Sequence, residues 1–172
     1  SPFFLGSAAG VECGMLEFGN VSRETFKNYY ETASYGKAHF SGQLSDVVDV
    51  EITKNDYEEQ FKTQGGYGYL YYLENIVKKA VASIPDFDRN AYDIDGNGYF
   101  DAIHFVTNFR GATWADWLWP HMRTANMEIR GTLSLGSFSF DSLEFMTQSG
   151  AEAPTHEQGH IFGINDYYNY VQ

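Results

Sequence analysis

Apolar residues recur at helical spacing in the middle of the chain. Between positions 69 and 84 they stand three or four residues apart, at Leu70, Leu73, Ile76, Val77, Ala80, Val81 and Ile84. Residues with this spacing share one face of an α-helix, so the pattern predicts an amphipathic helix over 69–84. Pro85 follows and cannot continue a helix. We therefore expect a helix that packs its apolar face against a core and ends before Pro85.

A second helix is predicted over residues 23–33, where Phe26, Tyr29 and Tyr30 have helical spacing. Ser22 is its expected N-cap, and residues 34–36 should end it. Runs of β-forming residues predict strands at 15–18, 37–42 and 47–53 and a buried strand at 101–107. Residues 128–135 and 138–145 are expected to form a hairpin that turns at 135–137, followed by a polar loop at 146–154.

Composition and charge narrow the class of protein. The chain has 172 residues, 43% of them hydrophobic and 17% aromatic, which suits one folded domain with a substantial core. The formal net charge of -12 argues against binding to nucleic acid or anionic membranes. No apolar run is long enough to span a membrane. Cys13 is the only cysteine, so no intrachain disulfide forms, and we interpret it as a small buried residue.

Residues 155–166 carry the most specific chemical signal, the sequence Thr-His-Glu-Gln-Gly-His-Ile-Phe-Gly-Ile-Asn-Asp. Pro154 suits the first turn of a helix. On such a helix His156 and His160, four residues apart, face the same way and can both coordinate one zinc ion. Glu157 can reach a water at the metal without being a ligand. The alternative interpretation is a surface helix with two solvated histidines.

Two further residues extend this motif. Gly163 suits the left-handed turn that ends a helix. After such a turn, Asp166 could supply a third, oxygen ligand. Three protein ligands leave one position for water, as a hydrolytic zinc site requires.

A second candidate metal site follows the central helix. Carboxylate, amide and carbonyl oxygens stand at the first, third, fifth, seventh and ninth places of a calcium loop, at Asp93, Asp95, Asn97, Tyr99 and Asp101. Gly98 occupies the sixth place. The twelfth place is His104 rather than glutamate, so Asp86 or Asp88 would have to replace that ligand. The alternative is a metal-free turn built by Asx side chains.

Two other histidines have structural interpretations. His104 falls in the predicted strand 101–107, where a hydrogen-bonded core or edge histidine is expected rather than a ligand. His121 follows a tryptophan-rich segment. We expect it to make a structural hydrogen bond, with a place beside a substrate as the alternative.

Three segments together resemble the catalytic domain of the immune inhibitor A family of secreted bacterial metalloproteases. They are Ser34-Tyr35-Gly36-Lys37 before a strand, Tyr92–Gly98 before a buried strand, and His156–Asp166 followed by Tyr167-Tyr168. The resemblance covers roughly residues 23–172. It implies an α+β fold of the zincin or metzincin kind, with a mixed twisted sheet, a backing helix and an active-site helix. It also implies catalytic zinc, structural calcium, secretion and a protein or peptide substrate.

On that pattern His156 and His160 are zinc ligands, Glu157 is the general base and Asp166 is the third ligand. Members of the family continue into a methionine-containing turn beneath the metal, whereas Met146 precedes the motif. We therefore expect residues 1–172 to be a single catalytic domain, either a compact relative or a fragment without the methionine-turn segment.

The expected reaction is the hydrolysis of peptide bonds by a metal-activated water. Two alternatives stay open. One is a non-catalytic, calcium-binding interaction module on a truncated protease scaffold. The other is a zinc hydrolase that acts on something other than peptides. Glu157, which catalysis needs and a binding module does not, favours an enzyme.

Overall fold

The computed structural model describes residues 15–18, 21–42, 45, 47–51, 53, 55–56, 59, 63, 74–82, 91–108, 120–129, 133–149 and 152–166. The predictions for Cys13, Asp86, Asp88 and Tyr167-Tyr168 lie outside these residues. The chain divides into two compact units. The first contains residues 1–43, 102–124 and 137–172, and the second contains residues 44–101 and 125–136.

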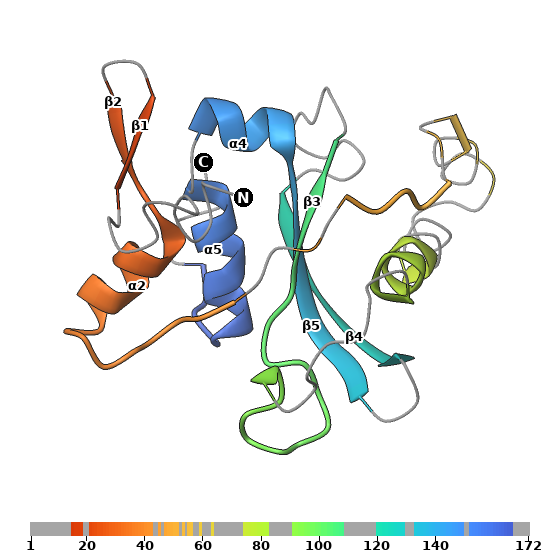
Figure 1. Cartoon of the computed structure of the whole chain (residues 1–172). Coiled ribbons are helices and arrows are strands. Elements are labelled where there is room, and N and C mark those ends of the chain that lie inside the picture. The colour runs from red at the N-terminus through yellow and green to blue at the C-terminus, as the bar shows by residue number, and fades with distance from the viewer. Residues whose placement is uncertain are drawn as a thin grey trace. The chain divides into compact units, whose positions relative to one another are not determined.

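The fold is mixed α/β, with a three-stranded mixed sheet and several helices (Figure 1). The sheet has the order β3-β5-β4, with β3 at His104–Thr107, β5 at Leu133–Ser142 and β4 at His121–Ile129. β3 runs parallel to β5, pairing His104 with Ser139. A separate antiparallel pair joins β1, Met15–Phe18, to β2, Val21–Glu24. The strand predicted at 15–18 is therefore confirmed.

The first unit contains the helix that carries the motif and two helices that contact it. They are α2 at Phe26–Ala33, α4 at Leu143–Ser149 and α5 at Glu152–Ile161, and α5 contacts both of the others (Figure 1). Its core is formed by Phe26, Phe138, Phe140 and Met146. The second unit has its own core, formed by Ile76, Val77, Val81, Phe100, Met127, Leu133 and Leu135. Each of the two units therefore has its own hydrophobic core.

The central helix is confirmed where the structure describes it. Residues 74–82 are helical, and Ile76, Val77 and Val81 of the predicted stripe are buried. The strand predicted at 101–107 is confirmed as β3, although it is half-buried, with Val106 36% exposed, rather than fully buried.

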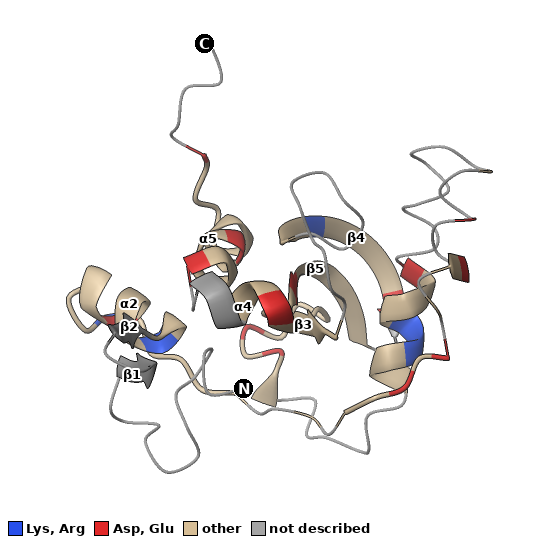
Figure 2. Ribbon diagram, turned by 90° about the horizontal axis from the view of Figure 1, so that it is seen from above, with Lys and Arg blue, Asp and Glu red and all other residues tan. Residues whose placement is uncertain are grey.

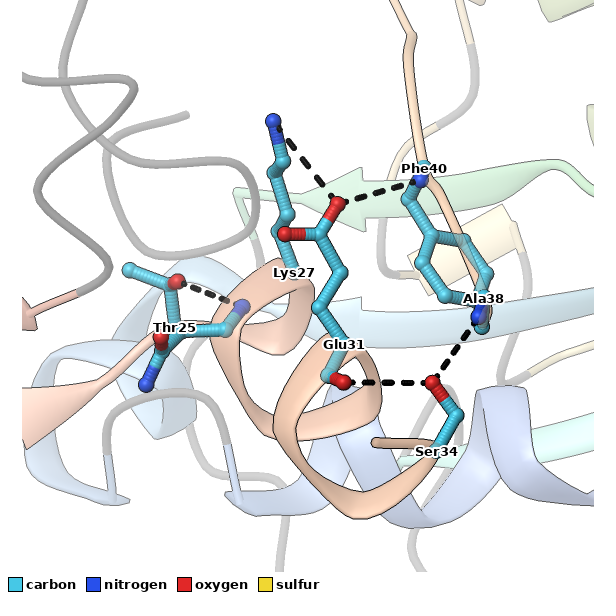
Figure 3. A network of polar contacts seen from close by, with 7 residues as sticks. Thr25, Lys27, Glu31, Ser34, Ala38 and Phe40 are labelled. Atoms are coloured by element: carbon cyan, nitrogen blue, oxygen red, sulfur yellow. Dashed lines mark hydrogen bonds and ion pairs between the residues drawn. The ribbon is translucent and has the colours of Figure 1, made fainter. Parts of the chain in front are cut away.

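Side chains near the two ends of helix α2 accept hydrogen bonds from backbone N–H groups (Figure 3). Its N-cap is Thr25, whose Oγ1 accepts from the N–H of Asn28 at 3.3 Å, so the expectation of Ser22 was wrong. Ser22 lies in β2, where it pairs with Glu17. The helix ends as predicted at 34–36, with positive φ angles at Tyr35 and Gly36.

Residues 37–42 form no strand, which corrects that prediction. Side chains from α2 bind this segment instead: Ser34 Oγ accepts from the Ala38 N–H at 2.9 Å, and Glu31 Oε1 from the Phe40 N–H at 3.5 Å (Figure 3). They satisfy backbone donors that a neighbouring strand would otherwise pair. The described residues of 47–53 also form no strand.

The predicted hairpin was wrong. β5 continues straight through residues 135–137, and its first partner strand, β4, ends at Ile129. Residues 143–149 are helix α4 rather than strand and loop, and α5 begins at Glu152 within the predicted polar loop. Among the described helices, none has the length and apolar composition that crossing a membrane would require.

Candidate metal centre

Helix α5 carries the motif in the conformation that the sequence predicts. Pro154 lies buried in its first turn, where a missing N–H leaves no helical hydrogen bond unmade. The helix ends at Ile161, and the turn that follows contains Gly163, whose φ of +84° few other residues adopt. The Ile164 N–H then bonds back to the Gly159 carbonyl at 2.9 Å. This turn reverses the chain and returns residues 164–166 toward the helix.

The turn brings three metal-ligand atoms together. His156 Nε2 and His160 Nε2 are 3.2 Å apart, and Asp166 Oδ1 lies 3.1 Å from the first and 3.4 Å from the second. A tetrahedral zinc site with bonds of about 2.0–2.1 Å has ligand-to-ligand distances of about 3.3–3.4 Å. The three atoms therefore have nearly the spacing of one face of a zinc tetrahedron. Among the described residues, they form the one cluster of this kind.

His160 is held in the tautomer that a metal ligand needs. Its Nδ1 lies 2.8 Å from the carbonyl oxygen of Ile164, so Nδ1 carries the proton and donates it. In the neutral ring, Nε2 then presents a lone pair toward Asp166 and His156. A backbone carbonyl that orients a histidine through its second nitrogen is a common support for bound zinc. The same turn thus positions Asp166 and orients His160.

Glu157, next to His156 in the sequence, is buried, with only 9% of its surface exposed. Burial raises the pKa of its carboxyl, against the opposing effects of the two neighbouring histidines and of a hydrogen bond from the Met122 N–H. Asp166 adds a smaller upward effect on that pKa. A carboxyl with a raised pKa accepts protons more readily near neutral pH than an exposed glutamate does.

A second buried carboxyl lies in the electrostatic field of Glu157. Asp141 of β5 is completely buried. Burial raises its pKa to about 7, a bond from the Ser142 N–H opposes this, and Glu157 adds to the increase. Sequence reasoning missed Asp141. The signal that could have found it is an aspartate in a run where Phe138, Phe140 and their neighbours are all apolar or small.

The helix that carries the motif and its neighbour α4 have acidic side chains and, apart from the histidines, no basic ones. Helices α4 and α5 contain Glu144, Glu152 and Glu157 and no lysine or arginine (Figure 2). A cation bound by His156, His160 and Asp166 would lie in a favourable field.

A support beneath α5 comes from α2. The Tyr30 hydroxyl donates to the Thr155 carbonyl at 2.7 Å, and burial raises the pKa of this phenol to about 12. The Tyr30 ring packs against Phe26, Phe40 and Phe162. Gly159 leaves room for the hydroxyl, since a Cβ there would lie 2.6 Å from it. α5 is therefore held on this side by both a polar and an aromatic contact.

The predicted calcium loop is folded by its own side chains. Asp93 Oδ2 accepts from the Gly98 N–H at 3.1 Å, Asp95 Oδ1 from the Asn97 N–H at 3.1 Å, and Asn97 Oδ1 from the Tyr99 N–H at 2.8 Å. Asp101 Oδ2 accepts from the Ile94 N–H at 3.0 Å. Gly96 and Gly98 have φ angles of +69° and +86°. The three carboxylates are not gathered into a cluster comparable to the one on α5.

Two histidines outside the motif, in β3 and β4, make contacts within the sheet. His104 Nδ1 lies 2.7 Å from Ser139 Oγ, which confirms the expected hydrogen-bonded core histidine. His121, 7% exposed, stacks on Phe140 with an interplanar angle of 17°. Its burial and its stacking favour a structural role, and the hydrogen bond that we expected stays a prediction.

No family model matches the chain, and neither a curated protein nor a solved structure shows significant similarity to it.

Proposed function

We propose that this protein is a zinc-dependent endopeptidase of the zincin or metzincin kind. In this proposal His156, His160 and Asp166 hold zinc, and Glu157 is the general base. The observation that supports it most is the triangle of 3.1, 3.2 and 3.4 Å between the three ligand atoms. Two solvated histidines on a surface helix would have no reason to converge with a carboxylate from beyond the helix end.

When bound, zinc would lower the pKa of water and polarise the scissile carbonyl. Glu157 would take a proton from the attacking water as its oxygen bonds to the carbonyl carbon. The same carboxyl would then give that proton to the nitrogen as the C–N bond breaks. Its raised pKa suits both steps, because the group must accept and release a proton within one cycle.

A peptide is the substrate class that the neighbouring strand supports. Among the described strands, β4 is terminal in the sheet. The N–H of Met122 in β4 is directed at Glu157 and so is not donated to β5. Among the described residues, no other strand pairs with this side of β4, so an extended peptide could bind there as an added strand beside the general base. Secretion, and action outside the cell, are proposed from the family resemblance alone.

We also propose a structural calcium ion in loop 93–101. The side chains of Asp93, Asp95 and Asn97 each accept a hydrogen bond from the N–H of a later residue, which holds the loop folded. Asp93 Oδ1 is shielded from solvent and has no hydrogen-bond partner among the described residues, so it could bind a cation, whereas Asp95 Oδ2 accepts from Asn97 Nδ2 at 2.9 Å and would have to exchange that bond for the metal. Binding would have to draw the carboxylates closer than they lie now. Otherwise the loop is a metal-free Asx turn.

Hydrolysis of a denatured protein substrate, measured together with zinc content, tests the enzymatic proposal. Glu157→Ala should abolish hydrolysis and leave about one zinc per chain, because a general base is not a ligand. Glu152→Ala, an exposed glutamate on the same helix, is the matched control and should keep both activity and zinc. Loss of zinc from Glu157→Ala would contradict the assigned role. An inactive but calcium-binding chain would favour the non-catalytic alternative.

A further inference from the structure

A chain of three polar side chains runs through the interior of the first unit. Gln158 Nε2 donates to Ser139 Oγ at 2.6 Å, and Ser139 Oγ lies 2.7 Å from His104 Nδ1. Gln158 is 1% exposed, Ser139 is fully buried, and the Nε2 atom of His104 is inaccessible to solvent. We call these three residues the buried relay. It joins α5 to β5 and β3, the two parallel strands of the sheet.

The Gln158 amide nitrogen can only donate, so Ser139 Oγ accepts the first hydrogen bond of the relay. Ser139 Oγ and His104 Nδ1 share the second, in which the hydroxyl donates to one tautomer of the neutral ring and accepts from the other. Burial lowers the pKa of His104 to about 3, so the ring is neutral at neutral pH in either arrangement.

The place of Gln158 on the helix relates the relay to the metal ligands. Gln158 is two residues after His156 and two before His160, which puts its side chain about 200° around the helix from each. It is thus anchored on the face opposite the metal-binding face. A helix rotation of about 10° would displace an imidazole nitrogen roughly 6 Å from the axis by about 1 Å. Displacements of that size disrupt metal sites and catalysis.

We propose that the buried relay positions α5 in rotation, so that His156 and His160 face Asp166 at metal-binding distance. This inference rests on the proposed zinc site. An apolar residue at 158 would bury just as well, but apolar contacts are not directional and permit the helix to turn. A buried amide that is hydrogen-bonded to a buried hydroxyl has one low-energy orientation, because leaving either group unpaired is costly. Gln158, Ser139 and His104 are positioning residues and touch no substrate.

Cobalt(II) substitution tests the proposal on the intact chain, because tetrahedral cobalt with nitrogen and oxygen ligands absorbs strongly in the visible region. The unsubstituted chain should give an intense spectrum. Gln158→Met, which keeps the length of the side chain, and Ser139→Ala, which removes only the hydroxyl, should each weaken cobalt and zinc binding by about 10–100-fold and reduce the intensity of the spectrum. Using both variants protects the test if one of them fails to fold, as judged by circular dichroism.

Leu135→Ala is the matched control, since Leu135 is a fully buried residue of β5 that belongs to the second unit. It should lower the melting temperature and leave the cobalt spectrum and affinity unchanged. Unchanged binding in both relay variants would overturn the positioning role while leaving the zinc site standing. An equal loss in Leu135→Ala would also overturn it, since the effect would then be general destabilisation. A featureless spectrum from the unsubstituted chain would overturn the zinc site, and the positioning role with it.

Discussion

Replacing Asp141 by asparagine should remove a pH-dependent loss of stability. Asp141 Oδ1 accepts from the Ser142 N–H at 2.7 Å, whereas Oδ2 is shielded from solvent and has no hydrogen-bond partner among the described residues. An ionised carboxylate is therefore unfavourable at this position. Asparagine has the same shape, keeps the oxygen that accepts from Ser142 and carries no charge.

The size of the effect follows from the shift in pKa. The Asp141 carboxyl has a pKa of about 7 in the folded chain, against an ordinary value of 3.8. A shift of about three units at 1.36 kcal/mol each corresponds to about 4 kcal/mol. Between these two pH values the folded state binds the proton and the unfolded state does not, so the free energy of unfolding falls as the pH rises. Above about pH 7 both states are ionised and the loss is complete.

Urea unfolding with EDTA present measures this directly. Between pH 4.5 and 8, the free energy of unfolding of Asp141→Asn relative to the unsubstituted chain should increase by about 3 kcal/mol. Asp49→Asn, at an exposed aspartate, is the control and should show no such trend. A constant difference between Asp141→Asn and the parent chain across this range would refute the reasoning. It would mean that the buried carboxyl is ionised in the folded state without cost.

Three other predictions concern the supports of the two candidate metal sites. Gly159→Ala should lower the free energy of unfolding by about 1–3 kcal/mol, because the new Cβ would meet the Tyr30 hydroxyl. In a Tyr30→Phe background the same substitution should cost less, and a double-mutant cycle of urea unfolding measures the difference. Equal costs in the two backgrounds would mean that this contact is irrelevant. Gly163→Ala should lower the free energy of unfolding by about 1 kcal/mol and weaken zinc binding, because alanine disfavours the positive φ of this turn and Asp166 would be displaced. Gly163→Asn should bind zinc more tightly than Gly163→Ala, because asparagine tolerates positive φ. Calcium at a hundredfold excess over its Kd should raise the free energy of unfolding by about 2.7 kcal/mol and protect loop 93–101 from proteolysis. If calcium does not change the melting curve, the metal-free Asx turn is the correct interpretation.

The local parts of the metal centre could be predicted because they depend on residues close in sequence. His156 and His160 meet through helical periodicity alone, and the turn at Gly163 returns Asp166 within a few residues. The relay could not be predicted in this way. Ser139 is 19 residues from Gln158 and 35 from His104, and only the pairing of β3 with β5 brings them together.

The wrong hairpin has a physical explanation. Gly136 suggested a turn, but it lies within β5, where a Cβ would come 3.1 Å from the Tyr99 ring. The glycine marks a close approach of another side chain to the strand, a role that a single sequence does not distinguish from a turn. Similarly, Ser22 and Thr25 are both good caps, and the pairing of Ser22 with Glu17 decides between them.

X-ray absorption at the zinc edge, on the zinc-loaded chain, tests the central claim most directly. The spectrum should contain the scattering of two imidazole rings, with nitrogen and oxygen neighbours at about 2.0–2.2 Å and no sulfur. His160→Ala should leave the signal of one imidazole, whereas His39→Ala, at an exposed histidine elsewhere in the chain, should leave both. A spectrum without imidazole scattering, or one that His160→Ala does not change, would contradict a zinc site formed by His156, His160 and Asp166.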